Sequence, residues 1–147
     1  SSNSNTGATT GLDNDFSVIV LSGQVSMTNQ FGLAQISPFA EYVTNSNQSE
    51  NNTGYIVGVK FGDKKVNAER KWQGKVAYRE LETDAWLDIF PNADAYGGAT
   101  NVKGYDASLT YGLSKKTSVS VNYFNMDTNT GVQDANSIVQ LDLNIKF

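Results

Sequence analysis

The amino-acid sequence predicts an all-β fold: an antiparallel transmembrane β-barrel, of which this chain supplies about seven C-terminal strands of a larger barrel. Three observations predict it. Apolar and polar residues alternate with the period of two that characterises a β-strand. The alternating runs hold roughly nine to eleven residues, longer than a usual soluble strand and enough for a tilted strand to cross a bilayer. Short links alternate with long polar links, as they do in outer-membrane barrels.

Composition narrows the function classes. The chain has 147 residues, a formal charge of -4 and only 11 Lys and Arg residues, which argues against a nucleic-acid partner. Cys and His are absent, which removes thiol chemistry, His-based triads and most transition-metal sites. Carboxylates are numerous, but none is expected in a pocket beside a base or a nucleophile. We therefore expect no enzyme, no cofactor and no metal site.

Seven runs account for the expected strands. In chain order they cover residues 16–27, 33–42, 54–62, 71–80, 104–113, 117–125 and 137–147. The first run is apolar on both faces before Ser22. Its apolar face is expected to carry Ile19, Leu21, Val25 and Met27. The second run alternates except at Phe39, and the later runs alternate more regularly, so apolar residues should line one face of the sheet and polar residues the other.

Aromatic residues stand near both ends of the apolar face on three consecutive runs. They are the pairs Tyr55 and Phe61, Trp72 and Tyr78, and Tyr105 and Tyr111. Paired aromatics at strand ends are typical of the lipid-facing girdle of a membrane barrel. Aromatics also pack well in the core of a soluble β-sandwich. The girdle is favoured because no charge lies between the aromatic ends of this face.

The links set the expected orientation. Two links are short, "TNQFG" and "SKK", and "GDKKVNAER" between them is of medium length. The links that alternate with these are long and polar: "TNSNQSENNT", "LETDAWLDIFPNADAYGGATN" and "MDTNTGVQDAN". If the short links are periplasmic turns, the C-terminus is periplasmic and a long outer loop covers about residues 81–101. Residues 1–14 are polar and do not alternate, so we expect an extracellular loop segment there and barrel strands over 15–147.

The end of the chain, "SIVQLDLNIKF", alternates up to a terminal Phe. With Leu143, Ile145 and Phe147 it resembles the C-terminal signal by which the barrel-assembly machinery recognises and inserts bacterial outer-membrane proteins. The stretch from "KWQGKVAYRE" to "VNYFNMD" is similar to the C-terminal part of bacterial outer-membrane putative porins, in which a Lys-rich strand leads into a large outer loop and a "GYDASLTYGLS" hairpin. This similarity covers about half of the chain and implies an outer-membrane channel, without naming a solute.

About seven strands cannot close an ordinary bacterial barrel, which has an even number of roughly eight or more strands. Open edges in lipid would leave backbone N–H and C=O groups unpaired. Either one strand has escaped recognition or, as we prefer, the remaining strands of the barrel lie on another chain or fragment. The other expected partners are outer-membrane lipid and, during biogenesis, the barrel-assembly machinery, and a homo-oligomer is left open.

With the apolar face in lipid, the polar face would line a lumen. The candidate pore-lining cations are Lys60, Lys71, Lys75, Arg79 and Lys103, and the candidate acids are Glu41, Asp106 and Asp142. Lys71, Lys75 and Arg79 recur every four residues, about 13 Å apart on a strand. Such a row would concentrate anions in a pore. Alternatively, these cations pair with acids elsewhere in the barrel and only neutralise the wall.

The long outer loop is acidic, and its candidate constriction residues are Asp84, Asp88 and Asp94. The apolar run "AWLDIF" within it suggests a short helix or a fold back into the pore mouth. The alternative is an acidic loop in solvent. A Ca²⁺ ion between the three Asp residues is a weaker alternative, because their spacing matches no loop of known calcium geometry.

The function predicted from the sequence is that of an outer-membrane porin, an aqueous channel for passive diffusion of small hydrophilic solutes or ions, either without preference or leaning towards anions. Two alternatives of other classes stay open. One is an anchoring or scaffold barrel with little conductance. The other is a soluble secreted β-sandwich that acts as a binding module.

Overall fold

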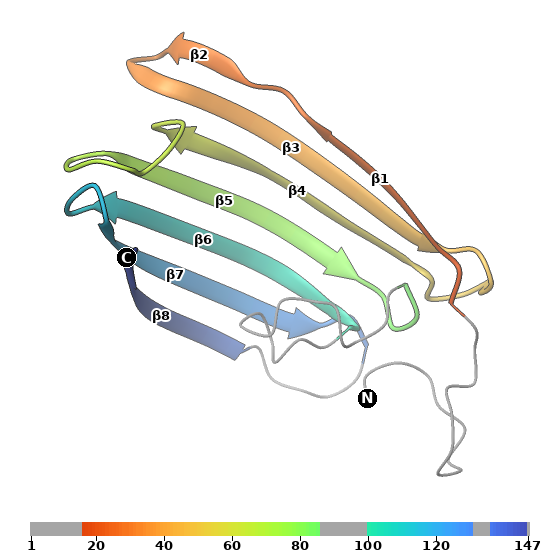
Figure 1. Ribbon diagram of the computed structural model, residues 1–147. Helices are drawn as coiled ribbons and strands as arrows, with labels where there is room; N and C mark the ends of the chain where they lie inside the picture. Colours follow the sequence, from red (N-terminus) through yellow and green to blue (C-terminus); the bar gives the residue numbers. More distant parts are fainter. Residues whose placement is uncertain (1–15, 86–99, 131–135, 147) are drawn as a thin grey trace.

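The structure is a computed structural model that describes residues 16–85, 100–130 and 136–146, and these residues form one curved antiparallel sheet (Figure 1). Its strands are β1 (Val18–Gln24), β2 (Met27–Gln30), β3 (Leu33–Asn45), β4 (Thr53–Gly62), β5 (Trp72–Leu81), β6 (Val102–Gly112), β7 (Thr117–Thr128) and β8 (Asn136–Ile145). The all-β antiparallel prediction is confirmed. The described residues contain no helix long and apolar enough to span a membrane.

The strands follow one another across the sheet in the order β1, β3, β4, β5, β6, β7, β8, and β2 also pairs with β3. The pairs Gln24↔Phe39 and Met27↔Ile36 keep one continuous register, so β1 and β2 share a single strand position beside β3. The interruption between them faces Pro38. Proline has no N–H to donate to the ladder, and only the bond from Val25 N to Pro38 O, 3.1 Å, remains there.

The sheet is not closed. Among the described strands, β1 and β8 each pair on one side only, so they form the two edges. Figure 1 shows them on opposite margins of the curved sheet. The expectation of about seven strand positions therefore agrees with the structure, with β2 as a short continuation of β1.

One face of the sheet is apolar and exposed. Cross-strand pairs such as Leu109↔Val121 and Val121↔Leu141 bring apolar side chains together on it. Val121 is 42% exposed, Leu141 71% and Leu143 63%. In a β-sandwich these side chains would be buried under a second sheet, whereas all the strands in the described part of the chain belong to one sheet. The sandwich alternative therefore has no support.

Buried apolar side chains lie on the opposite face, at the end of the sheet where β7 stops and β8 starts. Phe124 and Met126 form a small cluster there with Ile138 packed against it. The residues of β6 and β8 that stand opposite Phe124 and Met126 point to the same face of the sheet. Outside this apolar cluster, the face is mainly polar, and we call it the polar face.

The lengths of the links differ from the expectation. At one end of the sheet the links cover 31–32, 63–71 and 113–116, and at the other end 46–52, 82–101 and 129–135. The 63–71 link is thus longer than two of the links expected to be long. The reason is that β3 and β7 extend to Asn45 and Thr128, into segments that read as loop from their Asn and Thr content.

Gly104→Ala is expected to lower the free energy of unfolding by about 1–3 kcal/mol. Gly104 has φ +154°, and a Cβ there would collide with the backbone oxygen of Asn125 on β7. Thermal unfolding of the detergent-solubilised protein measures the effect. Gly23→Ala is the matched control, because a Cβ at Gly23 meets no atom within 4 Å. An equal loss in both variants would contradict this explanation.

Candidate functional site

The mainly polar face carries most of the charged residues that the sequence singled out. The register places on it Glu41, Lys60, Lys75, Arg79, Asp106 and Asp142. Three of these, Lys75, Arg79 and Asp106, come together in one cluster on β5 and β6. The others are spread over β3, β4 and β8.

Asp106 bridges the two cations of this cluster. Its Oδ1 lies 2.5 Å from Lys75 Nζ and its Oδ2 lies 2.9 Å from Arg79 Nη2, so each carboxylate oxygen meets one cation. Asp106 is only 2% exposed, whereas the two cations keep partial access to solvent. Arg79 Nε is buried without a hydrogen-bond partner. The cluster therefore carries a net charge of one positive unit. Its acid, Asp106, is more deeply buried than either cation.

Lys71 does not extend this row. It precedes β5, and its Nζ lies 2.7 Å from Oδ1 of Asp63 in the link between β4 and β5. Asp63 Oδ2 also accepts a hydrogen bond from Trp72 N, 3.0 Å. These interactions, that with Lys71 foremost, hold the pKa of Asp63 below its ordinary value. Lys71 therefore stabilises the link between β4 and β5 through Asp63 and is not part of β5.

The stabilising effect of Asp63 should depend on pH. Because its pKa is lower in the folded protein, its contribution is complete above the unfolded value of about 3.9 and is lost as the pH falls through the folded value. We expect the difference in unfolding midpoint between wild type and Asp63→Asn to be constant from pH 5 to 7 and to shrink below about pH 4. A difference that does not change with pH would contradict this role.

Lys103 lies on the other face, contrary to its expected grouping with Lys75. It stands opposite Glu80 on β5 and Asp127 on β7, two residues before Tyr105. Because residues two apart on a strand share a face, Lys103 belongs with Tyr105, at the end of the apolar face. It adds nothing to the charge of the polar face.

Lys60 is a cation of the polar face whose cross-strand neighbours are not acids. It stands between Ser37 on β3 and Lys75 on β5. Its Nζ lies 5.3 Å from the centroid of the Phe39 ring, a cation–π distance, so Phe39, the exception in the expected run 33–42, lies beside a cation on this face. Within the described residues Lys60 forms no ion pair, so its charge is available to a solute.

The two remaining acids of this face lie away from the cations. Asp142 on β8 accepts hydrogen bonds from Asn122 Nδ2, 2.8 Å, and Gln140 Nε2, 3.0 Å. Glu41 on β3 stands opposite Ser22 and Ile56. The positive charge of the polar face is therefore concentrated on β4 and β5.

Aromatic residues form rows at the two ends of the apolar face. At one end the ring centroids of Tyr78 and Tyr105 lie 4.9 Å apart, and those of Tyr55 and Tyr78 lie 6.1 Å apart. At the other end Phe61 meets Trp72 at 6.1 Å, and Trp72 stands opposite Tyr111. Six residues separate the rows on each strand, about 20 Å. Tyr42, opposite Tyr55, extends the first row onto β3 and was not among the expected girdle residues.

A protein-family model matches nearly the whole chain. The model of the family described as "Putative porin" matches residues 3–147. The chain belongs to this porin family. No curated protein matches the chain. Membership in the porin family supports a channel in an outer membrane, and the family is in general not enzymatic.

In this porin the expected constriction residues fall only partly within the described chain. Asp84 is buried just after β5, where its backbone oxygen accepts a hydrogen bond from Asn45 Nδ2, 3.1 Å. Asp88 and Asp94 lie outside the described residues. The base of the loop is fastened to its neighbour, because Glu82 Oε2 accepts hydrogen bonds from Thr53 N, 2.8 Å, and Thr53 Oγ1, 2.7 Å.

The C-terminal residues of the insertion signal are described except for the last. Leu143 and Ile145 lie on the apolar face of β8, opposite Val119 and Thr117. Phe147 lies outside the described residues. The two described residues of the expected signal thus lie on the exposed apolar face of β8, which is an edge strand.

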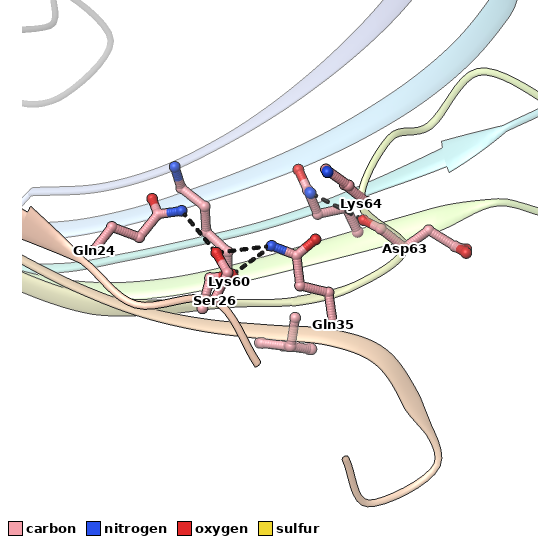
Figure 2. A pocket seen from close by; sticks show the side chains of 9 residues that line it. Gln24, Ser26, Gln35, Lys60, Asp63 and Lys64 are labelled. Carbon is pink, nitrogen blue, oxygen red and sulfur yellow. Dashed lines mark hydrogen bonds between the residues drawn. The ribbon is translucent and has the colours of Figure 1, made fainter. Parts of the chain in front are cut away.

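A polar pocket on the same wall was not expected from the sequence. It has a volume of about 380 Å³ and is lined by residues of β1, β3, β4 and β5, of the gap between β1 and β2, and of the 63–71 link (Figure 2). Gln24, Ser26, Gln35, Lys60, Asp63 and Lys64 are labelled around it in Figure 2. The sequence carries one signal that could have found it: Pro38, which breaks the ladder beside Ser26 and Ser37.

Proposed function

We propose that the porin forms an aqueous channel through which small hydrophilic solutes or ions diffuse passively, with the polar face of this sheet as part of the pore wall. The observation that carries the proposal is the contrast between the two faces of a single layer. One face is apolar, exposed and uncharged between two aromatic rows, and the other carries the buried and half-buried charges. Hydrocarbon suits the first face and water the second.

The proposed orientation has the C-terminus in the periplasm, with residues 1–14 and the loop over about 81–101 outside. The position of the shortest links supports it, because 31–32 and 113–116 lie at the same end of the sheet as the last described residues. In this orientation Lys60 and the polar pocket lie in the periplasmic half of the wall.

We propose that the wall leans towards anions. Lys75 and Arg79 share one carboxylate, and Lys60 stands beside them without an acid, so β4 to β6 carry a local excess of positive charge. A cationic wall lowers the entry barrier for anions and raises it for cations.

The remaining strands of the barrel are proposed partners. The open edges β1 and β8 support this, because unpaired backbone groups cost several kcal/mol each in lipid. The barrel-assembly machinery is a proposed partner during biogenesis, supported by the alternation of Leu143 and Ile145 on the edge strand.

Planar-bilayer recording tests the proposal. The purified porin is expected to give stepwise conductance in KCl, and a KCl gradient is expected to give a reversal potential with the sign of chloride preference. No conductance from correctly folded protein would refute the channel and favour an anchoring barrel. A reversal potential with the sign of potassium preference would refute only the anion preference.

A further inference from the structure

The polar pocket between β1 and β5 is lined by amide, hydroxyl and ammonium groups, and the buried Oε1 of Gln35 accepts no hydrogen bond within the described residues. Gln35 Nε2 donates to Ser26 Oγ, 3.1 Å, and to Ser37 Oγ, 2.6 Å, and Gln24 Nε2 reaches Ser26 Oγ at 3.4 Å. The two serine hydroxyls are 3.0 Å apart, so one donates to the other. Because the amides already supply protons to both oxygens, the second hydroxyl proton is free to point to an acceptor in the pocket.

Two lysines also line this pocket. Lys60 and Lys64 both line the pocket, and neither forms an ion pair within the described residues. The carboxylate that lines it, Asp63, is occupied: one oxygen meets Lys71 Nζ at 2.7 Å and the other accepts from Trp72 N at 3.0 Å. The pocket therefore has two uncompensated positive charges beside its hydroxyls.

We propose that this pocket is a binding site for a small hydroxylated anion, such as a sugar acid, on its way through the channel. The inference rests on the proposed function and adds the solute class. Lys60 and Lys64 would bind the anionic group, and charge-assisted hydrogen bonds of this kind are about twice as strong as neutral ones. Ser26, Ser37 and the side-chain amide of Gln73 would bind the hydroxyl groups. A pocket of about 380 Å³ admits a molecule the size of a monosaccharide.

The pocket is built by the break in the sheet. The gap between β1 and β2 faces Pro38, and Ser26 lies in this gap opposite Ser37. Gly62 stands opposite Gln35 and Gln73, so no side chain fills the space between those two amides. The local irregularity thus places three amides, two hydroxyls and two cations around one opening.

Calorimetric titration of the detergent-solubilised porin tests the site without requiring transport. The probes are D-gluconate, glucose as its neutral counterpart, and acetate as an anion without hydroxyl groups. Gluconate is expected to bind at least about tenfold more tightly than either. Lys60→Gln is expected to weaken gluconate binding about tenfold and leave glucose unchanged, and the double variant Ser26→Ala with Ser37→Ala to weaken it several-fold. Lys115→Gln, which removes an equal charge from the exposed link between β6 and β7, is the matched control.

Each outcome decides something. No heat with gluconate, or equal loss in Lys60→Gln and Lys115→Gln, overturns the site. Equal binding of gluconate and glucose overturns the anion requirement, and equal binding of gluconate and acetate overturns the hydroxyl requirement. Gluconate binding without conductance in the bilayer would support the binding site and refute the channel. Conductance without gluconate binding would support the channel and refute the binding site.

Discussion

Val121→Arg is expected to prevent stable insertion of the porin into a bilayer. Val121 lies near the middle of β7 on the apolar face, between Leu109 and Leu141, and is 42% exposed. If this face meets lipid, an Arg near the bilayer midplane costs about 2–4 kcal/mol. That is a large part of the 5–15 kcal/mol typical of a folded domain, so the folded fraction in vesicles should drop sharply.

Asn122→Arg is the matched control, one residue along the same strand. Asn122 points to the polar face, where its Nδ2 donates to Asp142 Oδ2 at 2.8 Å. An Arg there keeps a donor for the same carboxylate and stays in water, so normal insertion is expected. Urea unfolding from lipid vesicles and heat-dependent gel mobility measure both variants. Equal behaviour of the two would show that the faces do not differ in their surroundings, and the assignment of one to lipid would fail.

Strand positions and faces could be predicted from the sequence because period two needs only local information. The expected runs 71–80 and 104–113 differ from β5 and β6 by one or two residues at each end. Ile19, Leu21 and Val25 were also placed on the correct side of an ambiguous run, since Leu21 stands opposite Tyr42. The face of Lys103 also follows from the sequence alone, because Lys103 lies two residues before Tyr105 and therefore shares its face.

The charge cluster could not be predicted, because it depends on the register between strands. Nothing in β5 alone says which acid of β6 will lie between Lys75 and Arg79. The alternation gives the face of Asp106, but only the pairing of Ala77 with Asp106 brings the carboxylate level with both cations. The four-residue interval also predicts Lys71 on the same strand, but β5 starts at Trp72, so the interval does not extend to Lys71.

Asp106→Asn is expected to change both stability and ion preference. The variant removes the carboxylate that pairs with both Lys75 and Arg79, and it leaves these two cations as neighbours. Breaking a buried ion pair costs about 3–5 kcal/mol, and the lower end applies because both cations are partly exposed. In a KCl gradient the reversal potential should move further towards chloride, because the wall gains one net positive charge.

Asp142→Asn separates this effect from a general loss of negative charge. It removes the same charge from the same face, but the groups that Asp142 binds are the neutral amides of Asn122 and Gln140. It should therefore move the reversal potential in the same direction while destabilising the porin by no more than about 1 kcal/mol. An unchanged reversal potential in both variants would mean that this face does not border the conducting path.

The double variant Asp106→Asn with Lys75→Gln completes the argument. If the carboxylate stabilises the fold by separating two cations, removing one of them should restore most of the stability lost in Asp106→Asn, giving a coupling energy of about 1–3 kcal/mol. The net charge of the wall in this double variant equals that of the wild type, so the reversal potential should return to the wild-type value. Restored stability with an unrestored reversal potential would show that the cluster holds the sheet together but that ions pass elsewhere.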